Sequence, residues 1–68
     1  GIGQTIAIEN ASGINQIYIN IADINTINRY GKIIIIDDES YGSIYLDFVD
    51  EFNAVQAMAI LSYILSNP

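Results

Sequence analysis

The chain has 68 residues, 51% of them hydrophobic, and its two basic and eight acidic side chains give a formal charge of −6. Because it contains neither cysteine nor histidine, disulfides, thiolate or imidazole metal ligands, and Ser-His-Asp or Cys-His catalytic groups are excluded. The acidic balance also opposes binding to phosphate backbones and to anionic membrane surfaces. We therefore expect one small domain over residues 1–68 that is not an enzyme, carries no cofactor and does not bind membranes.

Apolar and polar residues alternate along the first third of the chain. Ile6 and Ile8 alternate with polar or small residues, and this period of two predicts a strand over residues 4–10. Turn-forming residues follow at 11–13. Alternating isoleucines then predict a second strand over residues 14–21, where β-branched side chains suit a half-buried sheet.

The spacing of the isoleucines changes from two to three near residues 22–23. A one-residue shift of this kind indicates a tight turn or bulge, after which a short third strand is predicted over residues 25–29. Gly31 is suited to the positive φ of a hairpin turn. A fourth strand is predicted over residues 32–37, and its four consecutive isoleucines require cover on both faces.

The last third of the chain changes from strand to helix periodicity. After a polar loop at residues 37–42, alternation predicts a fifth strand over residues 43–48. Asp50 is a suitable N-cap, and Glu51 complements the positive end of a helix dipole. A C-terminal helix is therefore predicted over residues 51–66.

These elements predict an α+β domain, with a four- to five-stranded antiparallel meander and one C-terminal helix. The meander would form a curled sheet or a small, partly open barrel. Apolar residues occupy most of the helix, including Phe52 at its start, and one chain of this length leaves apolar surface uncovered. A second copy would cover it. The predicted oligomer interface consists of Val55, Met58, Ala59, Leu61 and Leu65.

The acidic group Asp37, Asp38 and Glu39 is the best candidate for a cation site, because oxygen-rich clusters suit calcium or magnesium. As a calcium loop it is incomplete, since the position of the bidentate glutamate is occupied by Phe48. We expect the tip of a hairpin whose carboxylates remain in water, with a specific cation site as the alternative.

Aromatic and basic residues suggest a further alternative. Tyr18 and Tyr45 are predicted to point away from the isoleucine faces of their strands, as stacking platforms for single-stranded nucleic acid do. Arg29 and Lys32 are the only cations that could follow the phosphate backbone. Tyrosines that cover sheet edges or lie in a protein interface explain the same pattern.

The chain resembles small bacterial and phage-encoded proteins in residues 18–27, 32–36 and 44–48 and in its alanine-bearing helix. In those proteins a strand ends in an Asp-apolar turn, two more strands follow and a short helix closes the unit. Such folds are similar to Sm-like or pleckstrin-like half-barrels, many of which work as rings or docking modules. The resemblance carries no functional residue over to this chain.

These observations favour a non-enzymatic, homo-oligomeric structural or interaction module, in the cytoplasm or, if the chain is phage-encoded, in the virion. An Sm-like ring that binds nucleic acid is one alternative. A protein that binds a cation through its acidic loop is another.

Overall fold

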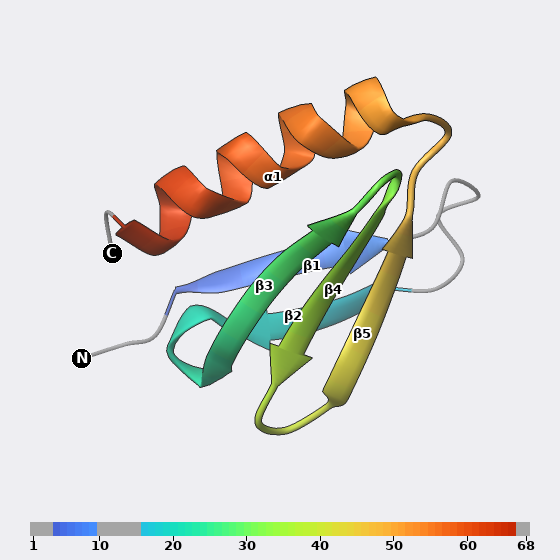
Figure 1. The fold of residues 1–68 in the computed structure, drawn as a ribbon. Coiled ribbons are helices and arrows are strands. Elements are labelled where there is room, and N and C mark those ends of the chain that lie inside the picture. Colours follow the sequence, from blue (N-terminus) through green and yellow to red (C-terminus); the bar gives the residue numbers. More distant parts are fainter. Residues whose placement is uncertain (1–3, 10–15, 67–68) are drawn as a thin grey trace.

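The computed structural model describes residues 4–9 and 16–66, which form five strands, one short 3₁₀ helix and one α-helix (Figure 1). The elements are, in chain order, β1 (Thr5–Glu9), β2 (Gln16–Asn20), η1 (Ile21–Asp23), β3 (Ile24–Tyr30), β4 (Ile33–Asp38), β5 (Gly42–Asp47) and α1 (Glu51–Ser66). The helix spans the range expected from its periodicity. The outer ends expected for the first two strands, residue 10 and residues 14–15, lie outside the described residues.

The strands form two antiparallel sheets and not one continuous meander. β1 pairs with β2, with Ile6 opposite Ile19, and β3, β4 and β5 form a second sheet in that order. The two sheets do not close into a barrel. The α+β class and the C-terminal helix are thus confirmed, and the curled sheet is divided between β2 and β3.

The division lies where the isoleucine spacing changes. Residues 21–23 form η1, and the side chain of Asn20 caps it by accepting a hydrogen bond of 3.0 Å from the backbone N–H of Ala22. A register shift between Ile24 and Thr26 then places a bulge at the start of β3. The sequence predicted a tight turn or a bulge here, and the structure has both, one after the other.

Two glycines make the turns of the three-stranded sheet. Gly31, at φ +61°, lies between β3 and β4, and Gly42, at φ +79°, begins β5. β4 continues to Asp38, so the polar loop expected at 37–42 is shorter than predicted. Asp38 holds the turn because its Oδ2 accepts the backbone N–H groups of Ser40 and Tyr41 at 2.9 and 3.0 Å.

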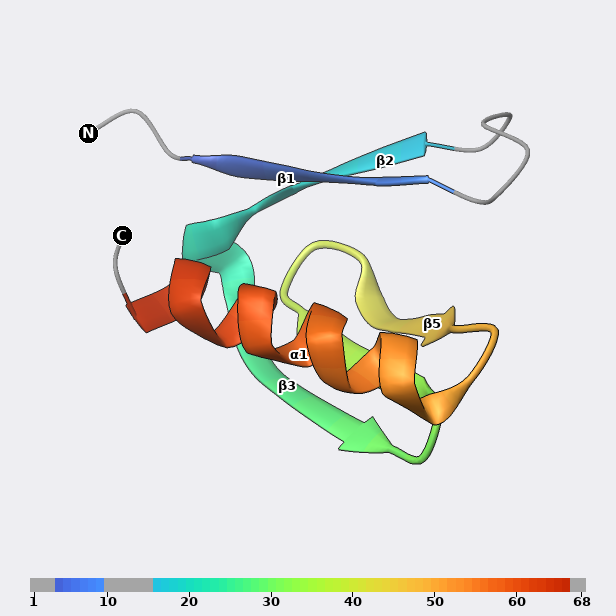
Figure 2. The ribbon, with the colours of Figure 1, turned by 90° about the horizontal axis from the view of Figure 1, so that it is seen from above.

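The core lies against one face of the three-stranded sheet. Ile34 and Ile36 of β4 are fully buried and pack with Ala54 and Leu61 of α1. Isoleucines of β1 pack against the same cluster. In Figures 1 and 2, the β1–β2 hairpin lies behind the three-stranded sheet, and α1 runs along the top of both.

The chain covers one face of its three-stranded sheet. The first hairpin closes the inner face of the β3–β5 sheet together with the helix, whereas the opposite face remains open to solvent. The residues of β4 that lie on this outer face, Ile33 and Ile35, are only half-buried. We expected both faces of β4 to be covered, but this chain covers only the inner face.

Candidate interaction surface

The start of α1 is fixed by the capping residue predicted from the sequence. Asp50 Oδ1 accepts the backbone N–H of Asn53 at 2.8 Å, which satisfies one of the free donors of the first turn. Its carbonyl accepts the N–H of Ala54 at 3.2 Å. Glu51 forms a 3.1 Å ion pair with Arg29 of β3 and so ties the helix start to the sheet. These contacts fix where α1 begins and hold its first turn beside β3.

The inner side of α1 consists of small and medium-sized residues. Ala54 is fully buried and Leu61 is 8% exposed, and Ala57 and Met58 pack against the same core cluster. Alanine at these positions lets the helix approach the sheet closely. Phe52, expected on the apolar side of the helix, is instead 69% exposed.

The outer side of α1 carries the larger side chains, which we call the outer ridge. Phe52 and Tyr63 are each 69% exposed, and Ile60 is 61% exposed. Val55 and Ala59 lie between them and are also exposed. No residue of this chain from 52 to 66 carries a charge. The outer ridge is thus an uncharged, mostly apolar strip from Phe52 to Tyr63.

The predicted oligomer interface is divided between the two sides of α1. Leu61 belongs to the buried core of one chain, and Met58 is partly buried against that core while it also lines the open groove beside β3. Leu65 is half-buried, whereas Val55 and Ala59 lie on the outer ridge. The reason is that a helix with apolar residues around most of its circumference shows no clear apolar side in its periodicity.

The sequence pattern therefore missed three residues of the outer ridge as candidate contacts: Phe52, Ile60 and Tyr63. Their spacing carries a signal, since positions 52, 60 and 63 are separated by eight and three residues, which places them on one side of a helix. The apolar pattern through Ala54 and Leu61 is equally consistent with a helix side. Only the contact with the sheet shows which of these two sides is buried.

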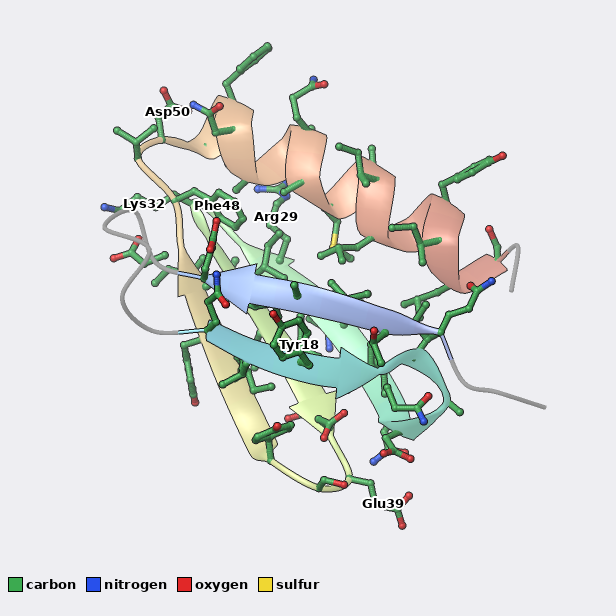
Figure 3. The ribbon with its side chains drawn as sticks, turned by 180° about the vertical axis from the view of Figure 1, so that it is seen from behind. Tyr18, Arg29, Lys32, Glu39, Phe48 and Asp50 are labelled. Atoms are coloured by element: carbon green, nitrogen blue, oxygen red, sulfur yellow. The ribbon has the colours of Figure 1, made fainter. Side chains whose placement is uncertain are left out.

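The tyrosines proposed for nucleic-acid stacking lie on different outer faces of the molecule. Tyr18 is 59% exposed on the hairpin, which lies in front in Figure 3. Tyr45 is exposed on the outer face of the other sheet, opposite Ile35. The two rings do point away from the core, as expected, but the structure does not bring them together.

The two cations are both held in ion pairs. Arg29 Nη1 lies 3.1 Å from Glu51 Oε1 and also donates to the carbonyl of Gly31 at 2.8 Å. Lys32 Nζ lies 3.5 Å from Asp47 Oδ1. Each positive charge is therefore neutralised by a carboxylate of the same chain, and neither joins a basic patch around a tyrosine.

The three carboxylates proposed for a cation site face different environments. Asp37 lies on the outer face of β4, Asp38 is 4% exposed, and Glu39 is exposed in the turn. Residues that alternate along a strand point to opposite faces, which separates the first two carboxylates. Asp38 also departs from the expectation of a solvated loop, because its Oδ2 is used to hold the turn and its buried Oδ1 has no partner among the described residues.

Asp37 is the carboxylate with a clear electrostatic perturbation. The hydroxyl of Ser43 donates to Oδ1 at 2.7 Å, and the hydroxyl of Thr26 donates to Oδ2 at 2.8 Å. These hydrogen bonds, that of Ser43 first, lower the pKa of Asp37 and outweigh the opposing effect of burial. The three side chains form one row across β3, β4 and β5. Both carboxylate oxygens are thus occupied by donors of the same chain.

The charged residues at the two ends of the sheet lie far apart: Figure 3 shows Lys32 and Asp50 near the start of α1 and Glu39 at the other end of the sheet.

Within residues 4–9 and 16–66, no three His, Cys, Asp or Glu side chains gather in a way that could hold a metal ion. In the same part of the chain, no helix has the length and apolar character needed to cross a membrane.

An open groove of about 620 Å³ lies between β3 and the C-terminal half of α1. Its walls combine apolar and small polar residues, among them Ile24, Asn25, Met58, Ser62 and Leu65. None of the residues that line it is charged. The groove offers no group that could act as a nucleophile activated by a base, so its geometry does not define a catalytic site.

No protein-family model, curated protein or solved structure matches this chain. Its function is therefore inferred from the arrangement of its own residues. Among the surfaces described above, the outer ridge of α1 combines the absence of charge with large exposed apolar side chains.

Proposed function

We propose that this protein is a non-enzymatic, homo-oligomeric structural or interaction module whose subunit contact is made by α1. The observation that carries the proposal is the outer ridge, where Phe52, Ile60 and Tyr63 remain more than 60% exposed although the other side of the helix packs against the core through Ala54 and Leu61. Contiguous exposed apolar surface bounded by polar residues is typical of sites of protein association.

The energetics of a small chain support this proposal. A domain of this size buries only about 60% of the surface exposed by its unfolded chain, so its core supplies little stability. Each large apolar side chain that is covered in an interface contributes about 1.5–3 kcal/mol if it becomes fully buried. Association through the outer ridge would thus add stabilising burial that 68 residues alone lack.

The distribution of charge supports the same surface. All ten charged residues lie outside residues 52–66, and the net charge of −6 keeps the rest of the surface mutually repulsive between copies. An uncharged strip is the place where two acidic molecules can meet with the least electrostatic opposition. Specific association at α1 is therefore compatible with an acidic, otherwise non-adhesive surface.

Light scattering during gel filtration tests the proposal, with two tyrosines as a matched pair. Tyr63 lies on the outer ridge and Tyr18 lies on the hairpin, with similar exposures of 69% and 59%. We expect the unaltered chain to have a mass at least twice 7.5 kDa at micromolar concentration. Tyr63→Ser should lower the apparent association constant at least tenfold, whereas Tyr18→Ser should leave it unchanged.

A stable mass of 7.5 kDa for the unaltered chain would rule out the proposed function. Equal weakening by Tyr63→Ser and Tyr18→Ser would also contradict it, because the contact would then not be specific to α1. Far-ultraviolet circular dichroism of both variants establishes that any change in mass occurs between folded chains.

A further inference from the structure

We infer that two copies of this chain associate by antiparallel packing of their outer ridges, about a two-fold axis that passes between Gln56 and Ala59. This inference rests on the proposed function and specifies the geometry of the contact. A two-fold interface requires one surface that is complementary to itself. The order of side chains along α1 and the position of its charges provide that complementarity.

The outer ridge has nearly the same sequence of side-chain types when read from either end. An aromatic ring lies near each end, Phe52 and Tyr63, and aliphatic side chains lie inside them, Val55 and Ile60. In an antiparallel pair centred between residues 57 and 58, each aromatic ring meets the other aromatic ring of the partner helix. Aromatic pairs of this kind favour offset or edge-to-face contact.

The middle of the outer ridge permits close approach. Ala59 is small and lies opposite Gln56 in this arrangement, so the two backbones can come together at the interaxial distance of about 8–10 Å that is usual for packed helices. The small Ala59 of one copy leaves room for the longer Gln56 side chain of the other, so the side chains can interlock. The polar amide of Gln56 lies close to the axis, where it can bond its counterpart or remain at the edge.

The charges at the start of α1 select the antiparallel orientation. Asp50 and Glu51 lie at the N-terminal end, and no charge lies beyond them on the helix. A parallel pair would place these carboxylates beside their counterparts. An antiparallel pair separates the two acidic ends by roughly the length of the helix, about 22 Å at 1.5 Å per residue. This exceeds the Debye length of about 8 Å at physiological salt, so the repulsion is largely screened.

The other open surfaces are less suited to a second copy. The outer face of the three-stranded sheet has half-buried Ile33 and Ile35, but it also carries Asp37 and Asp47. Pairing of two such faces would bring four carboxylates together, with Lys32 of each copy as the nearby cation. The outer ridge carries no charged residue, so no carboxylates repel one another where two ridges meet.

Cysteine cross-linking tests the geometry, because the chain has no cysteine of its own. In the antiparallel pair, two copies of residue 52 would be offset by about 16 Å along the helix axis. This is well beyond the Cα separation of about 7 Å that limits a disulfide. Phe52→Cys or Tyr63→Cys alone should therefore cross-link poorly under mild oxidation.

A mixture of the Phe52→Cys and Tyr63→Cys chains should give the heterodimeric disulfide at a yield at least fivefold above either chain alone. Gln56→Cys, close to the axis, should cross-link with itself. Asn28→Cys, on the outer face of β3, is the control for random collision and should give only background yield.

The outcomes separate the geometry from the proposed function. Efficient self-cross-linking of Phe52→Cys and of Tyr63→Cys would indicate a parallel pair and overturn the inference. An oligomeric mass with background cross-linking at residues 52, 56 and 63 would also overturn it, while the proposed self-association would stand. A monomeric mass for the unaltered chain would overturn both.

Discussion

The two sides of α1 have similar hydrophobicity and very different environments. Leu61 is 8% exposed against the sheet, and its neighbour Ile60 is 61% exposed on the outer ridge. Both are large aliphatic residues in the middle of one helix. What differs is the contact made by the chain itself, since only one side faces β4 and the hairpin. Apolar character alone therefore does not distinguish a core residue from a candidate contact.

The same contrast occurs along β4. Ile34 and Ile36 are fully buried beneath the helix and hairpin, while Ile33 and Ile35 are half-buried on the outer face. Four identical residues in succession are divided into two environments by the alternation of a strand. The inner faces of both elements stabilise one chain, and the outer face of α1 is the surface that we propose for association.

The largest expected effect breaks the inner contact of α1. Leu61→Ala should destabilise the chain by about 2–5 kcal/mol, because it removes buried methyl groups and leaves a cavity. This approaches the whole stability that a core of this size supplies, about 3–5 kcal/mol. Ile60→Ala, the adjacent exposed control, should change stability by less than about 0.5 kcal/mol.

Urea unfolding followed by circular dichroism measures both variants, at a concentration low enough for the unaltered chain to be monomeric. Similar losses for the two substitutions would show that the outer side of α1 is packed as tightly as the inner side. Met58→Asp or Leu61→Asp should likewise unfold the chain, and so they are unsuitable as probes of association.

An intermediate effect is expected at the helix start, where Asp50 caps α1. Asp50→Ala removes the acceptor of the 2.8 Å bond from the Asn53 N–H and should cost about 1 kcal/mol. Asp50→Asn keeps an oxygen acceptor and should retain most of the stability. Thermal unfolding of the two variants makes the comparison, and equal losses would mean that the cap contributes through its charge and not through its hydrogen bond.

The smallest expected effect concerns the outer face of the sheet. Ser43→Ala removes the leading cause of the lowered pKa of Asp37, so the pKa should rise towards its ordinary value. Thr26→Val removes the second cause and should raise the pKa of Asp37 less. The carboxyl carbon resonance of Asp37, followed by NMR as a function of pH, reports both shifts. A larger shift for Thr26→Val would reverse the assigned order of the two donors.

The sign of the accompanying pH dependence follows from the direction of the shift. The pKa of Asp37 is lower in the folded chain than in the unfolded chain, so ionisation favours folding. This contribution is fully present above the unfolded-state pKa and is lost as the pH falls through the folded-state pKa. The difference in stability between the unaltered chain and Ser43→Ala should therefore shrink in acid.

Local signals in the sequence predicted the turns and caps well. Gly31 adopts the positive φ expected for a hairpin, and Asp50 caps α1 as its position indicates. The change of isoleucine spacing near residues 22–23 coincides with η1. Each of these depends on a few neighbouring residues, so its physical cause is contained in the local sequence.

Features that depend on the fold beyond a few neighbouring residues could not be predicted from such local signals. Asp38 was expected in a solvated loop and instead lies 4% exposed at the end of β4, because the strand continues two residues beyond its last isoleucine. The separation of Tyr18 and Tyr45 depends on the folding of the hairpin behind the second sheet, which no periodicity records.

By itself, the sequence determined the α+β class, the range of α1, the positions of the five strands along the chain and the absence of cysteine and histidine chemistry in this chain. Alternation, capping and turn preference are local properties, and they are sufficient for these features. Only the tertiary structure decided which side of α1 is covered and which face of β4 remains open. That choice depends on where the hairpin and helix meet the sheet, because apolar residues surround most of the helix and any side could have been buried.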